Sequence, residues 1–372
     1  MNKIGIGLIG TGFMGKAHAF AYRASAATFP GLPEVDLVAI ADVTAEAAQK
    51  AAKQYGFRKG TGDWKALISD PDIHIISITT PNALHKEMSL AAIAAGKHVH
   101  CEKPLAPTLA DAVDMMKAAE AKGVVTQVGY NYIKNPVLKQ AREMIANCEL
   151  GEITGFRGIH AEDYMADPEG PYSWRLDPSG GPGVIADLGS HIIGMARFLL
   201  GPIAEVTADV ETVIKSRPVP GSTERKPVLA DDIARLLVRF ARGCGGSIEA
   251  SWVSTGRKMQ LEFEIHGSKG SLLFTQERFN ELHYFKVGVD PRYAGFTRIE
   301  SGPQYAPYVN FCVAQGHQLG FNDMKTIEMA EFIAAIAGAQ HGGPDFREAV
   351  EIQKVVDAAI RASKARGWVV IT

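Results

Sequence analysis

The chain has 372 residues, of which 46% are hydrophobic and 22% charged, and its 39 basic and 41 acidic side chains leave a net charge of −2. This length exceeds what one hydrophobic core usually supports, so two domains are expected. The balanced charge gives no electrostatic reason for binding nucleic acid or an anionic membrane, and we expect a small-molecule partner.

The cysteines and the N-terminal residues indicate a cytoplasmic location. Cys101, Cys148, Cys244 and Cys312 are widely separated and form no Cys-x-x-Cys pair, which fits reduced thiols better than a disulfide scaffold. The first ten residues are interrupted by glycines and precede no small-residue cleavage site, so we expect no signal peptide. No apolar stretch approaches the ~20 residues that cross a bilayer.

Short apolar runs alternate with alanine-rich helical stretches over the first ~125 residues. Strands are expected at 4–9, 37–41, 73–78, 98–101 and 124–128, and helices at 15–26, 44–55, 82–95 and 108–122. Thr44 and Thr108 are the expected N-caps of two of these helices. The alternation predicts an α/β, doubly wound parallel sheet with helices on both faces.

Longer segments with strand alternation follow residue 129. After a helix at 137–147, strands are expected at 153–161, 204–214, 233–240, 247–253, 261–266, 271–275 and 281–287, and two helices at 325–339 and 346–366 close the chain. Glycine-containing turns predict a large, mainly antiparallel open sheet, and residues 217–227 are expected to be a mobile loop. The open face of such a sheet favours a homodimer or homotetramer.

A glycine-rich turn follows the first expected strand and opens the first helix. It consists of Gly10, Thr11, Gly12, Phe13, Met14 and Gly15. The first glycine permits a tight turn, the second lets the backbone approach a pyrophosphate, and the third lets the helix pack closely on the strand. The position of the turn predicts a dinucleotide site at the positive end of the helix.

Asp42 ends the second expected strand, where a carboxylate can accept hydrogen bonds from an adenosine ribose. No arginine adjoins it to receive a 2′-phosphate, so the sequence favours NAD over NADP. The alternative is that Asp42 only caps the following helix.

A second polar loop, Thr80, Pro81 and Asn82 with His85, follows the strand at 73–78. Ligands of open parallel sheets bind outside the carboxyl ends of the strands, so this loop and the one after 98–101 are expected to face the cofactor. For Asn82, capping of the next helix is an equal alternative.

Asp187 and His191 lie four residues apart in an expected helix at 184–200, on a shared face. A carboxylate beside an imidazole can orient it and raise its basicity, which suits a proton acceptor. A metal site would need a third ligand, and Glu162, Asp163 and Asp167 supply no pattern for one. The structural alternative is a cap and a buried histidine.

Residues 98–104 read His-Val-His-Cys-Glu-Lys-Pro and combine several reactive side chains. On a strand, His98, His100 and Glu102 point one way and Cys101 and Lys103 the other, so no compact metal-ligand set forms and we expect no metal. The proline restricts the backbone where the strand ends, which would hold Lys103 at the mouth of the nucleotide crevice. The alternative is a solvated loop lysine.

Four motifs in this order resemble the Gfo/Idh/MocA oxidoreductases over essentially the whole chain. They are Gly10-Thr-Gly-Phe-Met-Gly15, Thr80-Pro-Asn82 with His85, Cys101-Glu-Lys-Pro104, and Asp187-x-x-x-His191. The resemblance implies an NAD(P)-binding Rossmann domain at 1–129 and a substrate-binding and oligomerisation domain at 130–372. It also implies that Lys103, Asp187 and His191 are catalytic, and that Glu102 and Pro104, often through a cis peptide, shape the nicotinamide pocket.

The same resemblance extends to the ligand contacts. Cofactor contacts are expected from Gly10, Thr11, Gly12, Phe13, Met14, Gly15, Asp42, Thr80, Pro81, Asn82, His85, Glu102, Lys103 and Asn131. Substrate contacts are expected from Lys103, Tyr130, Tyr164, Trp174, Arg175, Asp187 and His191. Two positions depart from the common family pattern. Ile133 stands shortly after the Tyr-Asn pair, where members often carry arginine, and Gly194 stands where aspartate is frequent.

Within the family, residues 156–175 are most similar to the levoglucosan dehydrogenase subgroup, with inositol dehydrogenases as further relatives. The implied activity is NAD-dependent oxidation of a secondary ring hydroxyl of a sugar, anhydrosugar or cyclitol to a ketone. Either Lys103 or His191 could be the immediate base. The alternatives are an NAD-dependent glycoside hydrolase and a non-catalytic nucleotide-sensing regulator.

Overall fold

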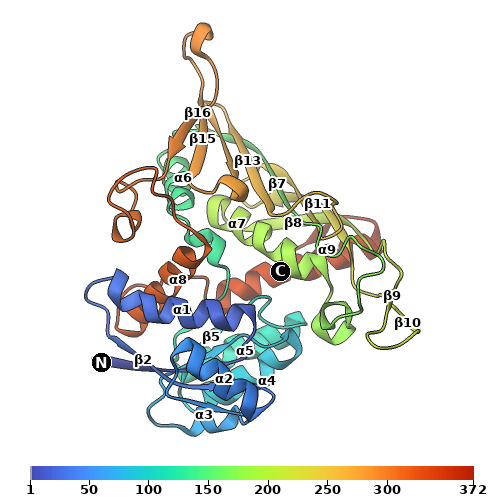
Figure 1. Ribbon diagram of the computed structural model, residues 1–372. Helices are drawn as coiled ribbons and strands as arrows, with labels where there is room; N and C mark the ends of the chain where they lie inside the picture. The colour runs from blue at the N-terminus through green and yellow to red at the C-terminus, as the bar shows by residue number, and fades with distance from the viewer. Residues whose placement is uncertain (1) are drawn as a thin grey trace. The chain divides into compact units, whose positions relative to one another are not determined.

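The structure is a computed structural model that describes residues 2–372 (Figure 1). Two compact units make up the chain: the first contains the chain up to Lys134 together with Leu319–Val350, and the second contains Asn135–Gln318 and Glu351–Thr372. Residues 319–350 thus group with the first unit rather than with the rest of the expected second domain. The functional assignment of 1–129 to the cofactor and 130–372 to substrate and oligomerisation remains a prediction.

A six-stranded, fully parallel sheet forms the centre of the first unit, as predicted. Its order is β3-β2-β1-β4-β5-β6, with bounds β1 Lys3–Ile9, β2 Glu34–Ala41, β3 Lys59–Thr61, β4 Ile75–Ile78, β5 His98–Cys101 and β6 Thr126–Val128. The order reverses between β1 and β4, which is the point where open parallel sheets bind ligands. The short β3 was not expected, because Lys-Gly-Thr has no apolar signal.

The helices of the first unit are α1 Phe13–Thr28, α2 Ala45–Tyr55, α3 Lys65–Ser69, α4 His85–Ala94, α5 Leu109–Lys122 and α8 Phe321–Ile336, with 3-10 turns η1 Asn82–Leu84 and η2 Asn131–Lys134. Thr44 and Thr108 accept the N–H of Ala47 and Asp111, which confirms both predicted N-caps. The strand order runs outward in two directions, so right-handed connections put α1 and α2 on one face and α4 and α5 on the other.

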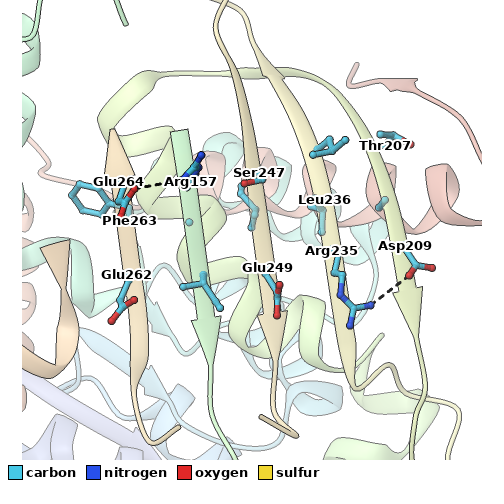
Figure 2. Close-up of a pocket in the computed structure, with 15 residues that line it drawn as sticks. Arg157, Thr207, Asp209, Arg235, Leu236, Ser247, Glu249, Glu262, Phe263 and Glu264 are labelled. Atoms are coloured by element: carbon cyan, nitrogen blue, oxygen red, sulfur yellow. Dashed lines mark ion pairs between the residues drawn. The ribbon is translucent and has the colours of Figure 1, made fainter. Parts of the chain in front are cut away.

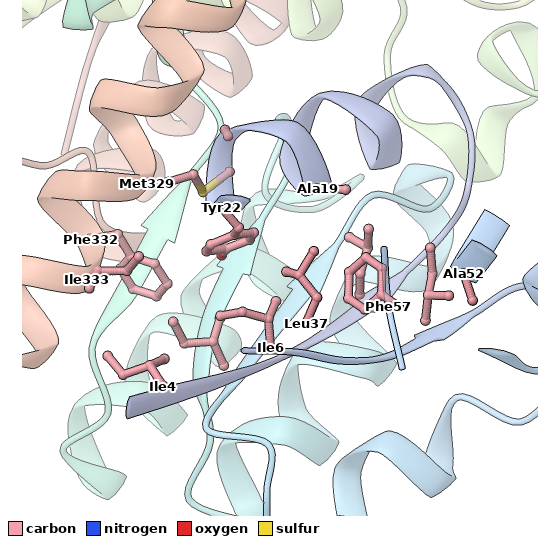
Figure 3. Close-up of a cluster of buried hydrophobic side chains, with 14 of the residues drawn as sticks. Ile4, Ile6, Ala19, Tyr22, Leu37, Ala52, Phe57, Met329, Phe332 and Ile333 are labelled. Carbon is pink, nitrogen blue, oxygen red and sulfur yellow. The ribbon is translucent and has the colours of Figure 1, made fainter. Parts of the chain in front are cut away.

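The apolar core between β1, α1 and α8 explains why the late helix belongs to the first unit (Figure 3). Ile4 and Ile6 of β1, Tyr22 of α1, and Phe332 and Ile333 of α8 are all fully buried. Burying each large apolar side chain contributes about 1.5–3 kcal/mol. The predicted helix at 325–339 is therefore confirmed, and it covers the sheet of the dinucleotide fold.

The second unit is built on a nine-stranded sheet in the order β16-β15-β14-β13-β7-β12-β11-β8-β17. The bounds are β7 Ile153–Ala161, β8 Ile203–Glu211, β11 Ile233–Phe240, β12 Gly245–Ser251, β13 Gln260–Gly267, β14 Gly270–Thr275, β15 Glu281–Lys286, β16 Thr297–Glu300 and β17 Val369–Val370. The pair β7–β12 is parallel and the other pairs are antiparallel, which confirms the predicted mainly antiparallel sheet.

Helices α6 Pro136–Ala146, α7 Ser190–Leu200 and α9 Phe346–Ala365 accompany this sheet, and the boundary between the two units falls inside α9. Shorter helical turns are η3 Trp174–Leu176, η4 Pro178–Gly180, η5 Ile185–Gly189, η6 Gln276–Arg278, η7 Pro291–Tyr293 and η8 Tyr308–Asn310. No helix within residues 2–372 is both long and apolar enough to cross a membrane.

The expectation of a mobile loop at 217–227 was wrong. These residues include β9 Ser216–Pro218 and β10 Arg225–Pro227, which pair as a short hairpin. Arg217 is 1% exposed and donates to the carbonyls of Met165 and Asp167. The Pro- and Gly-rich composition concealed this buried anchor, because its partners lie about fifty residues away.

Candidate functional site

The glycine-rich turn has the geometry that its three glycines require. Gly10 has φ +100°, and a Cβ there would stand 3.0 Å from the backbone of Thr79. At Gly15 a Cβ would lie 2.2 Å from the Gly10 carbonyl oxygen, so the helix packs directly on the turn. Both predicted roles, the tight turn and the close helix packing, are confirmed.

Gly12 leaves room for a ligand at the start of α1. No atom lies within 4 Å of the position that its Cβ would take, and no side chain caps the helix there. The first-turn N–H groups therefore have no side-chain cap at Gly12, and they lie at the positive end of the helix dipole. This arrangement fits the pyrophosphate of a dinucleotide.

Asp42 is held by the turn itself and does not cap the following helix. Its Oδ2 accepts the N–H of Thr11 at 3.0 Å and the Thr11 hydroxyl, and its Oδ1 accepts the N–H of Val43 at 2.6 Å. The hydroxyl of Tyr55 donates to the Thr11 carbonyl at 2.9 Å. Because Thr44 is the N-cap of α2, the alternative role for Asp42 was wrong, and its half-buried carboxylate stands beside the turn.

His85 joins the two loops that follow β4 and β5. Its Nε2 lies 3.0 Å from the carbonyl oxygen of Thr80, and its Nδ1 lies 3.0 Å from that of Pro104. The imidazole is fully buried, and burial lowers its pKa. Pro81 and Asn82 stand at the start of η1 in the same loop. His85 therefore bridges the two loops that were expected to face the cofactor.

The Lys103–Pro104 peptide is cis, and Glu102 beside it is 6% exposed. One oxygen of Glu102, Oε2, accepts the backbone N–H of Lys103 at 3.2 Å, while Lys103 itself is half-buried. Tyr130 and Asn131, which follow β6, are each 3% exposed.

Phe13 and Met14 complete the predicted set in the first unit. Phe13 is 73% exposed and its ring stacks on Phe321 at 5.7 Å, and Met14 is half-buried. Each predicted cofactor residue thus belongs to the glycine-rich turn or to a segment just after β2, β4, β5 or β6.

Asp187 lies in η5, a π-helical turn that precedes α7, and not within one continuous α-helix as expected. Asp231 sets this turn, since its Oδ1 accepts the N–H of Ile185 at 2.8 Å and its backbone carbonyl accepts that of Val184 at 3.0 Å. Burial raises the pKa of Asp231 to about 7. The simple one-turn spacing of Asp187 and His191 therefore does not describe their geometry.

Two predicted substrate residues contact Asp187 in the second unit, and a third stacks on one of them. The Tyr164 hydroxyl donates to Asp187 Oδ2 at 2.8 Å, and Arg175 Nε lies 3.5 Å from the same oxygen. The Arg175 guanidinium also stacks over the Trp174 ring at 4.4 Å.

A cavity of about 460 Å³ lies beside this cluster, within the second unit. It is lined by Tyr164, Met165, Asp167, Gly170, Pro171, Ser173, Arg175 and Arg217. The volume is in the range of small-molecule sites. The Tyr164 and Trp174 rings are 45% and 40% exposed, so apolar and polar surfaces are both available to a ligand there.

One residue near His191, His160, was missed by sequence reasoning. The ring of His160, on β7, lies 5.5 Å from that of His191. His160 Nδ1 is 3.0 Å from the Leu188 carbonyl oxygen, and its Nε2 is 3.2 Å from Glu162 Oε1. His160 could have been noticed at the end of an alternating strand, but only the fold shows that it adjoins α7.

The departure at Gly194 has a packing explanation. A Cβ at this buried position would stand 3.0 Å from Cδ1 of Ile352 on α9, so any larger side chain there would require Ile352 to shift. Ile133, the other departure, is 8% exposed in η2. Within the described residues 2–372, no three His, Cys, Asp or Glu side chains are grouped to hold a metal ion.

Comparison with known proteins gives a consistent result along the whole chain. Residues 4–130 match the oxidoreductase family with an NAD-binding Rossmann fold, and residues 138–273 match the GFO/IDH/MocA C-terminal domain. Levoglucosan dehydrogenase from Pseudarthrobacter phenanthrenivorans is 37% identical over 385 residues, covering 99% of this chain and 98% of that protein.

Solved structures are similar over the same extent. Levoglucosan dehydrogenase in complex with NADH and L-sorbose has a TM-score of 0.97 at 37% identity and covers 100% of both chains. An inositol dehydrogenase homologue from Azotobacter vinelandii, in complex with NADH and myo-inositol, has a TM-score of 0.83 at 25% identity and covers 99% and 98% of the two chains.

Proposed function

The chain belongs to the Gfo/Idh/MocA family of NAD-binding oxidoreductases, and from this premise we propose that it oxidises a secondary ring hydroxyl of a sugar, anhydrosugar or cyclitol to a ketone. The observation that carries the proposal is the convergence of Tyr164 and Arg175 on Asp187 beside a cavity of sugar size. Carboxylate, phenol and guanidinium groups are those that hydrogen-bond to a polyol.

Bound NAD⁺ supplies the hydride acceptor for this oxidation. The residues proposed to hold it are Gly10, Thr11, Gly12, Phe13, Met14, Gly15, Asp42, Thr80, Pro81, Asn82, His85, Glu102, Lys103 and Asn131. The open side of Gly12 and the uncapped start of α1 support pyrophosphate binding, and the half-buried Asp42 carboxylate supports binding of a ribose.

The substrate hydroxyl loses its proton to a base, which we assign to the pair Lys103 and His191. The Lys103 ammonium would also stabilise the developing alkoxide, and Asp187, oriented by Tyr164 and Arg175, would hold the reacting hydroxyl. Trp174 offers an exposed ring to the apolar face of the sugar, and Tyr130 belongs to the proposed substrate set.

The relatives, whose structures contain levoglucosan, L-sorbose or myo-inositol, support the proposed substrate class. A panel of anhydrosugars, pyranoses and inositols, with NAD⁺ or NADP⁺ and NADH absorbance as readout, tests the proposal. Stoichiometric NADH from one of these polyols supports it. Cleavage of a glycoside without net NADH would indicate a hydrolase instead, and nucleotide binding without turnover would indicate a regulator.

Variants then test the assigned residues. Lys103→Ala and His191→Ala should each lower kcat by about 10²–10⁴-fold, the usual contribution of a general acid or base. NADH binding measured by fluorescence should be unchanged in His191→Ala and mostly intact in Lys103→Ala, which also belongs to the proposed cofactor set. A double variant, Lys103→Ala with His191→Ala, that remained active would overturn the assignment of these two residues to proton transfer. The pH profiles of the single variants identify the immediate base, because its loss removes the acid limb of kcat.

The outer face of the nine-stranded sheet is proposed to join two or four copies of the chain (Figure 2). Arg235 pairs with Asp209 at 3.5 Å and Arg157 with Glu264 at 3.9 Å across a hollow of about 520 Å³, and Leu237 is 54% exposed beside them. A face with both charges suits a self-complementary contact. Leu237→Asp should shift the mass measured by light scattering toward the monomer.

The cysteines support the proposed cytoplasmic location. All four are free thiols, and Cys101 and Cys244 are buried. Thiols persist in this form in a reducing compartment.

A further inference from the structure

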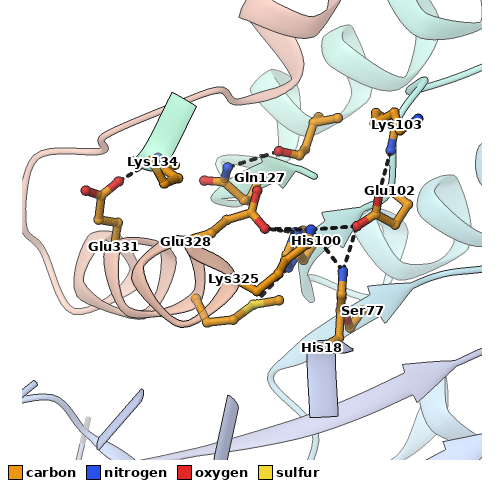
Figure 4. Close-up of polar contacts among 12 residues, drawn as sticks. His18, Ser77, His100, Glu102, Lys103, Gln127, Lys134, Lys325, Glu328 and Glu331 are labelled. Carbon is orange, nitrogen blue, oxygen red and sulfur yellow. Dashed lines mark hydrogen bonds and ion pairs between the residues drawn. The ribbon is translucent and has the colours of Figure 1, made fainter. Parts of the chain in front are cut away.

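A cluster of buried charged side chains adjoins Glu102 in the first unit, and the chemistry proposed above does not use it (Figure 4). Lys325 of α8 donates to Glu102 Oε1 at 2.7 Å and to Glu328 Oε2 at 2.8 Å. His18 of α1 lies with its Nε2 2.8 Å from the same Oε1 of Glu102. Lys325, Glu328 and His18 are all 0% exposed.

The charges in this cluster follow from its contacts. Burial alone would raise the pKa of Glu102, but Lys325 and His18 outweigh it and hold that pKa well below its usual value. Burial and the nearby Lys325 lower the pKa of His18 to about 4. A neutral His18 can therefore donate from Nε2 to Glu102 while its Nδ1 accepts the Ser77 hydroxyl at 2.8 Å.

The Glu102 carboxylate connects this cluster to the turn that carries Lys103. Oε1 accepts from Lys325 and His18, and Oε2 accepts the backbone N–H of Lys103 at 3.2 Å. The carboxylate has no room to move toward Gly129, where a Cβ would lie only 2.4 Å from Oε1. The orientation of the carboxylate, and with it the Lys103 backbone, is thus set from α1 and α8, and the charged donor among these contacts is Lys325 of α8.

Stability alone does not account for a fully buried lysine between two carboxyl groups. Desolvating ions is costly, and well-packed apolar side chains of similar volume often give equal or greater stability. What the ions provide is fixed geometry, because charge-assisted hydrogen bonds are short and directional.

We propose that Lys325 is a positioning residue, which acts through the Glu102 carboxylate to hold the Lys103 backbone in the orientation that hydride transfer requires. The inference rests on the catalytic role proposed for Lys103, and it adds a residue more than two hundred positions away in the chain. Glu328 accepts a second hydrogen bond from Lys325.

The ionisation of Glu102 provides the specific test. The titratable groups that face it are His18 from α1, Lys325 and Glu328 from α8, His100 from β5 and His85 from α4. Lys325 is the dominant cation, so Lys325→Met should let the buried carboxyl keep its proton up to neutral pH. A protonated Glu102 holds the Lys103 N–H more weakly, and activity should recover as the pH rises.

Steady-state kinetics between about pH 6 and pH 9 measure this effect. K325M should lower kcat by about 10- to 100-fold at the acid end, with a smaller change in KM, as expected for a misplaced catalytic group. The wild type should lack this additional acid limb. K134M is the matched control: Lys134 is also buried, and it also pairs with α8, through Glu331 at 2.5 Å. It should lose stability without gaining a new acid limb.

A substrate-free measurement separates this inference from the proposed function. In protein labelled with ¹⁵N-lysine, the Lys103 amide, assigned through K103R, should shift more between about pH 6 and pH 9 in K325M than in the wild type, because Glu102 itself titrates in that range only in the variant. If the amide titrates while no polyol is oxidised, the positioning contact stands and the proposed function fails.

The double variant K325M/E102Q keeps the inference testable if K325M alone unfolds, since it leaves no unpaired Glu102 charge. It should show no new acid limb, and its kcat should equal that of E102Q alone, because Lys325 acts only through Glu102. Three results would each overturn the inference. They are kcat losses of K325M and E102Q that multiply in the double variant, a kcat loss in K325M that is constant with pH, and a Lys103 amide that does not titrate in K325M.

Discussion

Both units contain a carboxylate that binds a cation, but the two surroundings differ. In the first unit Glu102 is 6% exposed, and its partners His18 and Lys325 are fully buried. In the second unit the Asp187 side chain is 20% exposed, and its partners are Arg175, with 41% of its side chain exposed, and Tyr164, 45% exposed.

This difference indicates that carboxylate–cation contacts have different roles in the two units, fixed geometry in the first and exchangeable contacts in the second. Water cannot compete inside the first cluster, so its hydrogen bonds are strong and its geometry is fixed. At the surface an ion pair contributes little and is easily exchanged, which fits the proposal that Asp187 exchanges a protein donor for a substrate hydroxyl. We expect changes in the first cluster to affect stability and geometry, and changes in the second to affect chemistry.

The largest expected effect tests the chemical side of this comparison. His191→Asn should lower kcat by about 10²–10⁴-fold, because one of the two groups assigned to proton transfer is lost. His266→Asn is the control, since His266 on β13 is partly exposed and pairs with Glu264 at 3.3 Å. Equal losses in the two variants would argue against a special role for His191.

Glu328→Gln tests the cost of burial in the first cluster. Burial raises the pKa of Glu328 to about 7 from an ordinary value of 4.5. The protonated form is thus favoured in the folded state, and the stability that it contributes is complete below about pH 4.5 and lost as the pH rises through about 7.

Glutamine does not titrate, so the variant should match the wild type near pH 4.5 and exceed it by about 1–3 kcal/mol near pH 8. Urea unfolding at the two pH values measures the difference. A pH-independent difference would contradict the buried, protonated state of Glu328.

Gly129→Ala tests how rigidly Glu102 is held. The added Cβ would stand 2.4 Å from a carboxylate oxygen that Lys325 and His18 keep in place. Overpacking of this kind costs about 1–3 kcal/mol of unfolding free energy. Gly295→Ala, where no atom lies within 4 Å of the new Cβ, is the control. Unchanged stability of both would show that the carboxylate can move.

The smallest effect is expected at the rim of the second cluster. Tyr164→Phe removes one hydrogen bond to Asp187, so kcat/KM should fall by about 5- to 10-fold, equivalent to about 1 kcal/mol. Tyr305→Phe removes a hydroxyl that bonds to Gln140 in the same unit and should leave kcat/KM unchanged. If Tyr164→Phe lowered activity more than His191→Asn does, Tyr164 rather than His191 would be the main contributor to catalysis.

Local pattern was enough to predict most elements. The strand at 98–101 and the strand at 153–161 have the bounds expected from alternation, and Thr44 and Thr108 cap the helices as expected. The miss at β3 has a physical cause: its three residues are held by pairing with β2, and they carry no apolar signal of their own.

The candidate site could be predicted only in part. The glycine-rich turn and Asp42 are readable because consecutive residues form them, and the structure confirms the geometry of the turn. His160 and Lys325 had no such signal, since a histidine in a strand and a lysine in a helix are ordinary. Their meaning depends on neighbours that lie 31 and 223 residues away, His191 and Glu102.

The sequence by itself determined the two kinds of sheet, the dinucleotide turn and the identity of the chemical groups, because periodicity and short motifs act between close neighbours in the chain. Only the tertiary structure decided which groups are buried and which are exposed. It placed α8 in the first unit, where its apolar side chains cover β1 and Lys325 donates a hydrogen bond to Glu102. Burial depends on what packs above a residue, and that is a property of the folded chain as a whole.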